Sequence, residues 1–371
     1  MKVQRIRFSD TNRSSWVVLG DDYLPVKPIV VFLKFMEDLG RSPNTIRATS
    51  HHLKLFWEYL RDERLDWKDL DIAHLAGFIS WLRNPQPSDV SPEVYQAERT
   101  DATIDQILTA IHGFYEFHIR MKSVPDIPLY SFVSMPNRRY KPMLYGIAGI
   151  KPVQTRNVKV KRGKNLIKTL TSEQVQEVFK ACTHIRDKFL LALLYETGMR
   201  IGQALGLRHS DISVENGKIS IIPRDDNANG MRAKTRSAYI VPAKTDLMQL
   251  YTDYLIEDLN ALEVDHFPDY IFVNLWDGEI GRPMTYETVM SLFRRLRKKT
   301  GIQVTPHMFR HTRATEWIRD DKLPLSTVSP LLGHKSIQTT QDIYVHLTPE
   351  DLRKELEDAA KRKSRNDVDE Q

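Results

Sequence analysis

Two arginines, two histidines and one tyrosine lie in three short segments of this chain, with no acidic cluster beside them. The first segment ends in Arg200, the second places His307 and Arg310 three residues apart, and the third places Tyr344 ten residues after His334. Two guanidinium groups can bind the oxygens of one phosphate in fork geometry and stabilise the extra charge of a pentacoordinate state. A tyrosine can attack that phosphate as a nucleophile. These residue types together point to DNA strand transfer.

The tyrosine needs help from its surroundings, because a phenol with an unperturbed pKa of about 10 is neutral at pH 7. Nearby positive charge favours the phenolate and screens the anionic phosphate that it must approach. A spacing of three residues places His307 and Arg310 on the same face of a helix. The sequence therefore predicts a helix that presents both side chains to one site.

The three segments resemble the tyrosine recombinase (phage integrase) family in order, spacing and local context. They read TGMRI at 197–201, HMFRHTRAT at 307–315 and LGH at 332–334, ahead of the tyrosine. The stretches SPNTI at 42–46 and LFWEYL at 55–60 are similar to the opening of that family's core-binding domain. Each motif alone is weak, but three in the same order are specific. The chain looks most like the transposase A proteins of multi-gene site-specific transposons.

The resemblance implies a role for each reacting side chain. Arg200 and Arg310 match the two arginines that clamp the phosphate. His307 matches an acid–base histidine, His334 a donor to a phosphate oxygen, and Tyr344 the nucleophile. The implied intermediate is a 3′-phosphotyrosine with a free 5′-hydroxyl. Because the bond energy stays in the ester, rejoining would need no metal, no other cofactor and no ATP.

The leaving 5′-oxygen still needs a proton, which a lysine on a β-hairpin supplies in this family. The stretch RAKTRSAYIVP at 232–242 fits that setting best and nominates Lys234. Arg232, Arg236 and Lys244 are close in sequence, and a hairpin register slips easily. A plain surface lysine is the alternative interpretation of Lys234.

Two positions depart from the family pattern. Gln203 replaces a glutamate that is usual three residues after the first arginine. A glutamine accepts a hydrogen bond without supplying charge, so we expect Arg200 to be held less firmly. His209 stands where a tryptophan is common, which indicates a packing change. His307 and His311, four residues apart, could form a metal pair, but no third ligand is evident, and a supporting role for His311 is favoured.

The elements that must position these residues divide the chain into five segments. Residues 26–121 carry four amphipathic stretches and predict an all-α domain, which the resemblance identifies as a SAM-like core-binding domain. Residues 166–350 open with a capping box at Thr171 and contain a hairpin signal at Asn216-Gly217, so the catalytic domain is expected there. The other segments are a β-like appendage at 1–25, a proline-rich basic linker at 122–165 and a tail helix at 351–371.

Composition agrees with a DNA-acting protein but does not identify one. The formal net charge is +6 over 371 residues, which fits an anionic partner and two domains. Cys182 is the only cysteine, so an intrachain disulfide and a multi-cysteine metal site are excluded. The longest apolar run, 189–195, is far shorter than the roughly 20 residues that cross a bilayer. We therefore expect a cytoplasmic protein with no membrane partner.

The resemblance implies a mostly α fold with a small antiparallel β-sheet, in which two domains close as a C-shaped clamp on double-stranded DNA. It implies a homo-tetramer or mixed synaptic complex, with a sister recombinase from the same mobile element. The tail at 351–371 either docks on its own domain or reaches a neighbouring protomer. The alternatives are a phage or genomic-island integrase, a type IB topoisomerase and a non-catalytic DNA-binding accessory protein.

Overall fold

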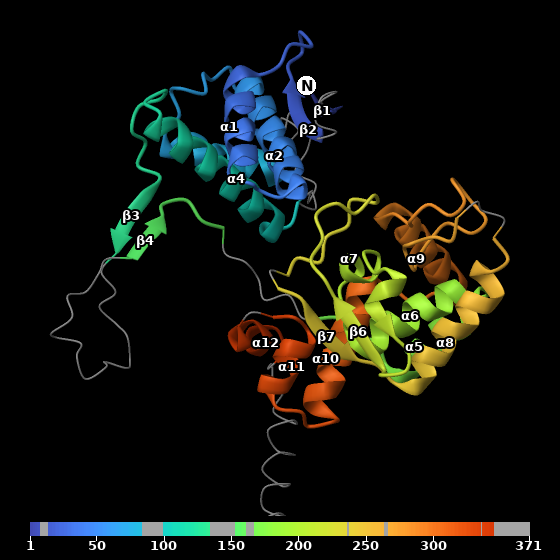
Figure 1. The fold of residues 1–371 in the computed structure, drawn as a ribbon. Coiled ribbons are helices and arrows are strands. Elements are labelled where there is room, and N and C mark those ends of the chain that lie inside the picture. The colour runs from blue at the N-terminus through green and yellow to red at the C-terminus, as the bar shows by residue number, and fades with distance from the viewer. Residues whose placement is uncertain are drawn as a thin grey trace, which may run out of the picture. The chain divides into compact units, whose positions relative to one another are not determined.

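The computed structural model describes residues 1–7, 14–83, 99–133, 153–160, 167–235, 237–262, 266–334 and 336–344. The chain forms two compact units, Met1–Asn165 and Leu166–Gln371 (Figure 1). Helices predominate in the described residues and the strands form small antiparallel sheets, which confirms the predicted fold class. Within these residues, no helix is both long and apolar enough to cross a membrane.

Unit 1 is built on the four helices that the hydrophobic periodicity predicts. Ser42 caps the second helix, because its hydroxyl accepts the Thr45 N–H at 3.2 Å. Aromatic rings fill the core, and Phe56 contacts both Phe78 and Tyr115 at centroid distances of 5.2 and 5.9 Å. The helices are α1 (Lys27–Asp38), α2 (Pro43–Asp62), α3 (Ile72–Arg83) and α4 (Asp101–Arg120).

The segment expected as an N-terminal appendage belongs to the core of unit 1. Strands β1 (Lys2–Arg7) and β2 (Ser14–Leu19) form an antiparallel hairpin in which Lys2 pairs with Leu19. Val18 is fully buried and packs in the same cluster as the helices. Met1, Val3 and Trp16 also pack against this cluster, so the hairpin contributes to the first hydrophobic core.

The described parts of the expected linker also fold onto unit 1. Strands β3 (Tyr130–Val133) and β4 (Val153–Arg156) pair antiparallel. Within this segment, residues 156–164 form a basic run. Its first residue, Arg156, donates to Thr109 on α4 at 2.9 Å. Lys161, Arg162 and Lys164 of that run lie outside the described residues. Apolar residues of the same segment are buried in the core of unit 1: Val124, Ile127, Leu129 and Val160.

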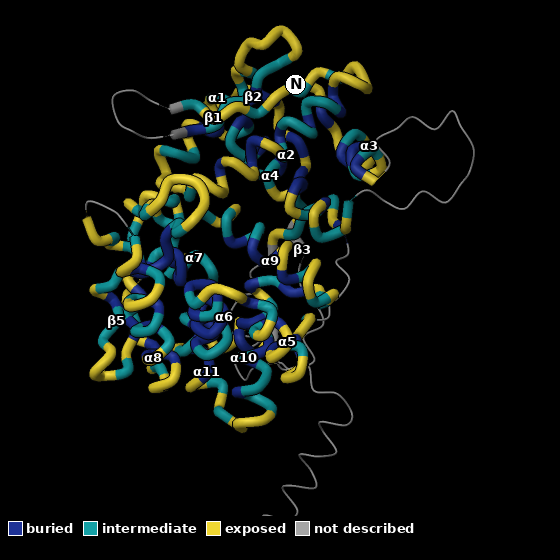
Figure 2. Tube along the Cα trace, turned by 90° about the vertical axis from the view of Figure 1, so that its right-hand side faces the viewer, coloured by how far each residue is buried: buried dark blue, intermediate teal, exposed yellow. Residues whose placement is uncertain are grey.

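Unit 2 surrounds the buried helix α6 (Ile185–Thr197), which lies in its interior against α8 and α10 (Figure 2). The predicted capping box opens α5, since Thr171 accepts the Gln174 N–H while the Gln174 side chain accepts the Thr171 N–H. Cys182 is free and buried. The other helices are α5 (Ser172–Ala181), α7 (Ile201–Ala204), η1 (His209–Asp211), α8 (Thr245–Tyr254), η2 (Leu255–Leu259), α9 (Tyr286–Thr300), α10 (Pro306–Arg319), α11 (Leu325–Leu331) and α12 (Ile337–Tyr344).

The predicted hairpin is present in a three-stranded antiparallel sheet with the order β5-β6-β7. Gly217 adopts φ +56 at the turn, a conformation that favours glycine. The strands are β5 (Ile212–Ser213), β6 (Lys218–Ile221) and β7 (Tyr239–Pro242). The long connection between β6 and β7 carries Lys234.

Candidate active site

The turn after α6 carries the first arginine. Gly198 ends the helix with φ +61, and a Cβ there would come within 3.0 Å of the Leu332 side chain. The chain therefore reverses closely enough to bring Arg200 beside the segment that ends in His334. The Arg200 Nη1 atom is buried and has no hydrogen-bond partner among the described residues. A buried guanidinium donor with unused capacity is suited to an anionic oxygen.

Arg310 on α10 ties three segments together. Its side chain is 1% exposed, and its Nη1 donates to the Gly198 carbonyl at 2.7 Å. Its Nη2 donates to the Leu332 carbonyl at 2.8 Å and lies 2.7 Å from His334 Nε2. These bonds fix the guanidinium between the Arg200 turn and the His334 turn.

His334 has a hydrogen-bond partner at each ring nitrogen. Nε2 contacts Arg310, and Nδ1 lies 2.9 Å from the Thr340 hydroxyl oxygen. Burial, followed by the charges of Arg310 and Arg200, lowers the pKa of His334 to about 4. The ring is therefore neutral at pH 7.

His307 lies among the predicted cationic residues. Burial lowers its pKa below the ordinary value of 6.5, and the charges of Arg310, Arg200 and Lys234 lower it further. Its ring is 4.3 Å from that of His311 on the same helix. A neutral imidazole near pH 7 can accept a proton, as an acid–base histidine requires.

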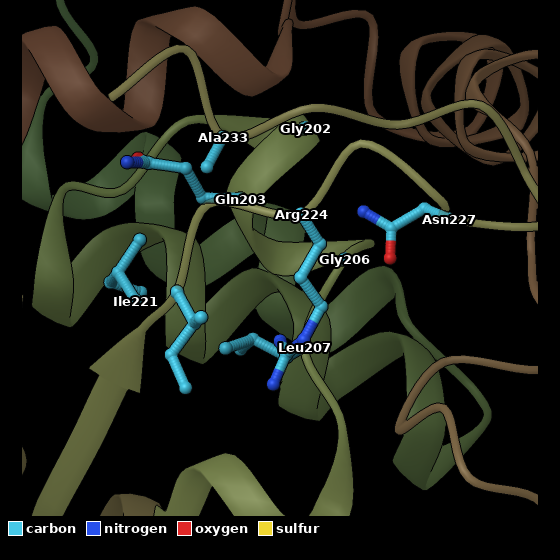
Figure 3. Close-up of a pocket in the computed structure, with 9 residues that line it drawn as sticks. Gly202, Gln203, Gly206, Leu207, Ile221, Arg224, Asn227 and Ala233 are labelled. Carbon is cyan, nitrogen blue, oxygen red and sulfur yellow. The ribbon is translucent and has the colours of Figure 1, made fainter. Parts of the chain in front are cut away.

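The Lys234 connection lies directly against α7. A Cβ at Gly202 would come within 2.8 Å of the Arg232 carbonyl oxygen, so the close approach requires glycine. Ala233 is buried at this contact, and Figure 3 shows it beside Gly202 and Gln203. The cavity between them has a volume of about 10 Å³, which holds about one water molecule. Lys234 follows with φ +53 and an exposed side chain.

The alternatives to Lys234 have other contacts or are not described. Arg232 lies 3.4 Å from Asp225, and the charge of Lys244 acts to lower the pKa of Glu196, which burial raises. Arg236 lies outside the described residues. By contrast, the charge of Lys234 acts on His307. This coupling favours Lys234 over Arg232 and Lys244, whose charges are not among those that lower the pKa of His307.

Gln203 holds the backbone of Arg200 and joins it to the sheet. The Gln203 side chain is buried, and its Oε1 accepts the Arg200 N–H at 2.8 Å. Its Nε2 donates to the Tyr239 hydroxyl at 2.9 Å. That hydroxyl would lie 2.7 Å from a Cβ at Gly333, which has φ +62. Gln203 and Tyr239 therefore connect the Arg200 turn to the turn that carries His334.

Sequence reasoning missed Tyr239 as a residue of the site. Tyr239 begins β7, in which Val241 is buried and Ile240 is 58% exposed. A strand tyrosine on the buried face is usually a packing residue. The Tyr239 hydroxyl is assigned to the site because it accepts a hydrogen bond from the Gln203 side chain.

Tyr239→Phe is expected to lower the free energy of unfolding by about 1–3 kcal/mol, because it leaves the buried Gln203 amide with an unsatisfied donor. Since the Arg200 and His334 turns lose their connection, DNA cleavage should slow as well. Urea unfolding and the rate of adduct formation measure the two effects. Tyr286→Phe removes a hydroxyl from a 42% exposed tyrosine and should change neither. If Tyr239→Phe also changes neither, the connection has no energetic role.

The structure places Tyr344 as the last residue of α12, and its side chain lies outside the described residues. His346 and the tail at 351–371 also lie outside them. His209 packs against two aromatic side chains of unit 2. Its Nδ1 lies 2.7 Å from the Tyr251 hydroxyl, and its ring is 5.0 Å from that of Phe267.

Comparison with known proteins places both units in one family. The model of the phage integrase family matches residues 168–351, and that of the phage integrase N-terminal SAM-like domain matches residues 29–122. The chain is 36% identical to Transposase A from transposon Tn554 of Staphylococcus aureus, over 98% of this chain and 99% of that protein. It is 32% identical to the tyrosine recombinase XerA of Saccharolobus solfataricus, over 87% and 89%.

The fold is also shared with a solved transposon integrase. The Tn1549 transposon integrase in complex with a circular intermediate DNA aligns with a TM-score of 0.63 at 15% identity. The alignment covers 89% of this chain and 98% of that one.

Proposed function

The chain belongs to the phage integrase family, and from this premise we propose that Tyr344 attacks a DNA phosphate held by Arg200 and Arg310. The protein is a site-specific DNA recombinase of the transposase type that acts on double-stranded DNA. The observation that carries the proposed mechanism is the buried Arg200 Nη1 without a partner among the described residues. Arg200 follows by two residues the Gly198 carbonyl that Arg310 holds.

The first step is phosphate binding. Arg310 is already fixed by two carbonyl groups, so it needs little reorganisation to face the phosphate. Arg200 supplies the donor that is not yet used. Preorganised cationic donors stabilise the charge that develops in the pentacoordinate state.

The second step is attack by the tyrosine. The Tyr344 O–H gives its proton to neutral His307, and the phenolic oxygen forms a bond to phosphorus. The lowered pKa of His307 keeps it unprotonated and ready to accept near pH 7. The surrounding positive charges also favour the phenolate.

The third step is departure of the 5′-oxygen. As its bond to phosphorus breaks, Lys234 donates a proton and leaves a free 5′-hydroxyl. The 3′-phosphotyrosine conserves the energy of the broken bond, so attack by another 5′-hydroxyl reverses the sequence and joins a new partner. Side-chain cations supply the charge stabilisation throughout, and the reaction proceeds without a metal or ATP.

Strand exchange requires at least two cleaved duplexes held together. We propose that copies of this chain, or this chain with a sister recombinase, form a tetrameric complex on DNA. The tail at 351–371 has a narrow apolar stripe that includes Leu352 and Leu356, four residues apart. A short helix of this kind has little stability alone, and a neighbouring protomer offers it a docking surface.

Strand exchange in EDTA tests this function. Duplexes tiled across the DNA that flanks the gene identify the bound site, and two labelled duplexes carrying that site are then incubated with the protein. Covalent protein–DNA adducts and chimeric duplexes are expected without Mg²⁺, because the site supplies no metal chemistry in this mechanism. Cleavage that requires Mg²⁺ would contradict the mechanism. Relaxation of supercoiled DNA without chimeric products would identify a topoisomerase instead.

A further inference from the structure

Thr340 is a buried polar residue on an otherwise exposed stretch of α12. It is fully buried, whereas residues 336–339 and Gln341 are exposed. Its hydroxyl oxygen lies 2.9 Å from His334 Nδ1. The Thr340 side chain is therefore linked to the active site by its contact with His334.

The contacts of His334 determine which ring nitrogen carries its proton. A guanidinium can only donate hydrogen bonds, so Arg310 Nη2, at 2.7 Å, requires Nε2 to be an acceptor. The proton of the neutral ring is then on Nδ1 and is donated to the Thr340 oxygen. In this state His334 has no proton on Nε2.

The role that the family resemblance implies for His334, donation to a phosphate oxygen, requires the opposite arrangement. To donate to a phosphate oxygen from Nε2, the ring must carry its proton there and leave a lone pair on Nδ1. One proton leaves Nδ1 and one arrives at Nε2, with water as the carrier, so the net charge is unchanged. A hydroxyl is both a donor and an acceptor, and Thr340 can therefore satisfy Nδ1 before and after the exchange.

We propose that Thr340 is a positioning residue that allows His334 to change tautomer when DNA binds. Its hydroxyl accepts from Nδ1–H in the free protein and donates to Nδ1 when Nε2–H faces the phosphate. It thereby keeps the ring oriented in both states. This inference rests on the proposed function, because it assumes that His334 donates to the phosphate.

Three variants separate the hydroxyl from the rest of the side chain. Thr340→Val keeps the shape and removes the hydroxyl, whereas Thr340→Ser keeps the hydroxyl. Thr339→Val makes the same change at the exposed neighbour on the same helix. On a nicked duplex that traps the adduct, Thr340→Val should react about 10- to 100-fold more slowly, as expected for one lost orienting bond at a catalytic donor. Thr340→Ser and Thr339→Val should react within about threefold of the wild type.

Nitrogen-15 spectra of the histidine side chains report the tautomer directly, with His334→Gln to assign the signals. Free protein should carry the His334 proton on Nδ1. Tyr344→Phe protein bound to an uncleaved duplex should carry it on Nε2, and adding Thr340→Val should give a mixture. An unchanged tautomer on DNA binding would overturn the proposal. A Thr340→Ser protein as slow as Thr340→Val, with an equally lowered melting temperature, would reduce Thr340 to a packing residue.

These experiments distinguish failure of the proposed function from failure of the proposed role of Thr340. If wild-type protein forms no adduct on the nicked duplex, the proposed function is wrong. If the wild type forms adduct and Thr340→Val forms it equally fast, only the role of Thr340 is wrong.

Discussion

Tyr344→Phe protein is expected to bind its DNA site with unchanged affinity and to form no covalent adduct. The substitution removes only the phenolic oxygen, so the contacts that hold the DNA remain while the nucleophile is lost. No other group in the proposed mechanism can form the ester, so adduct formation should fall by at least about 10⁴-fold. A nicked duplex, separation of protein-bound DNA under denaturing conditions and a binding titration measure both quantities.

Tyr286→Phe, at the exposed start of α9, provides the matched control and should retain full activity. Adduct that persists in the Tyr344→Phe protein would assign the nucleophile to another side chain. Loss of DNA binding together with loss of adduct would indicate that the hydroxyl of Tyr344 also contributes to DNA binding or to the fold.

Lys234→Ala is expected to lower cleavage of an ordinary duplex by about 10²–10⁴-fold, the usual contribution of a positioned proton donor. A duplex with sulfur in place of the bridging 5′-oxygen should restore the rate. A thiol with a pKa of about 8.5 leaves as its anion far more readily than an alcohol, so it needs no proton from the protein. Single-turnover cleavage of the two substrates measures the rescue.

The neighbours of Lys234 are the controls for this experiment. Arg236→Ala and Lys244→Ala should lose little activity on the oxygen substrate and gain little from sulfur. Rescue of either variant, with none for Lys234→Ala, would move the proton donor to that position. Slow cleavage of both substrates by Lys234→Ala would indicate that the lysine holds the phosphate instead.

Local signals allowed much of the fold to be predicted. The start of α2 is encoded locally, because Ser42 caps the helix and Pro43 occupies its first position. The Asn216-Gly217 pair predicted the β5–β6 hairpin because its turn conformation is encoded by those two residues. The boundaries of unit 1 were harder to predict. Val18 and Val160 join its core through contacts with distant helices, which periodicity in a short segment does not specify.

The proposed reacting residues follow from residue types and their order in the sequence, whereas the residues that support them could not be predicted in that way. The Tyr239 hydroxyl meets Gln203 across 36 positions of sequence. Thr340 is only six positions from His334. Its proposed role nevertheless depends on the contact between Arg310 and the other ring nitrogen of His334. Gly202 is required by the carbonyl of Arg232, thirty positions later. Each of these contacts joins different elements of the folded chain, so a local sequence pattern does not predict it.

The carbonyl bonds of Arg310 affect how an inactive form of this protein should be made. Its guanidinium supports the Gly198 and Leu332 segments, in addition to the phosphate contact proposed for it. Truncating a buried charged group leaves its partners unsatisfied and costs stability. Loss of activity in an Arg310 variant therefore does not measure the catalytic role of the arginine, because misfolding and loss of catalysis both abolish activity. A stalled protein–DNA complex for structure determination is better built on Tyr344, where the change is a single oxygen atom.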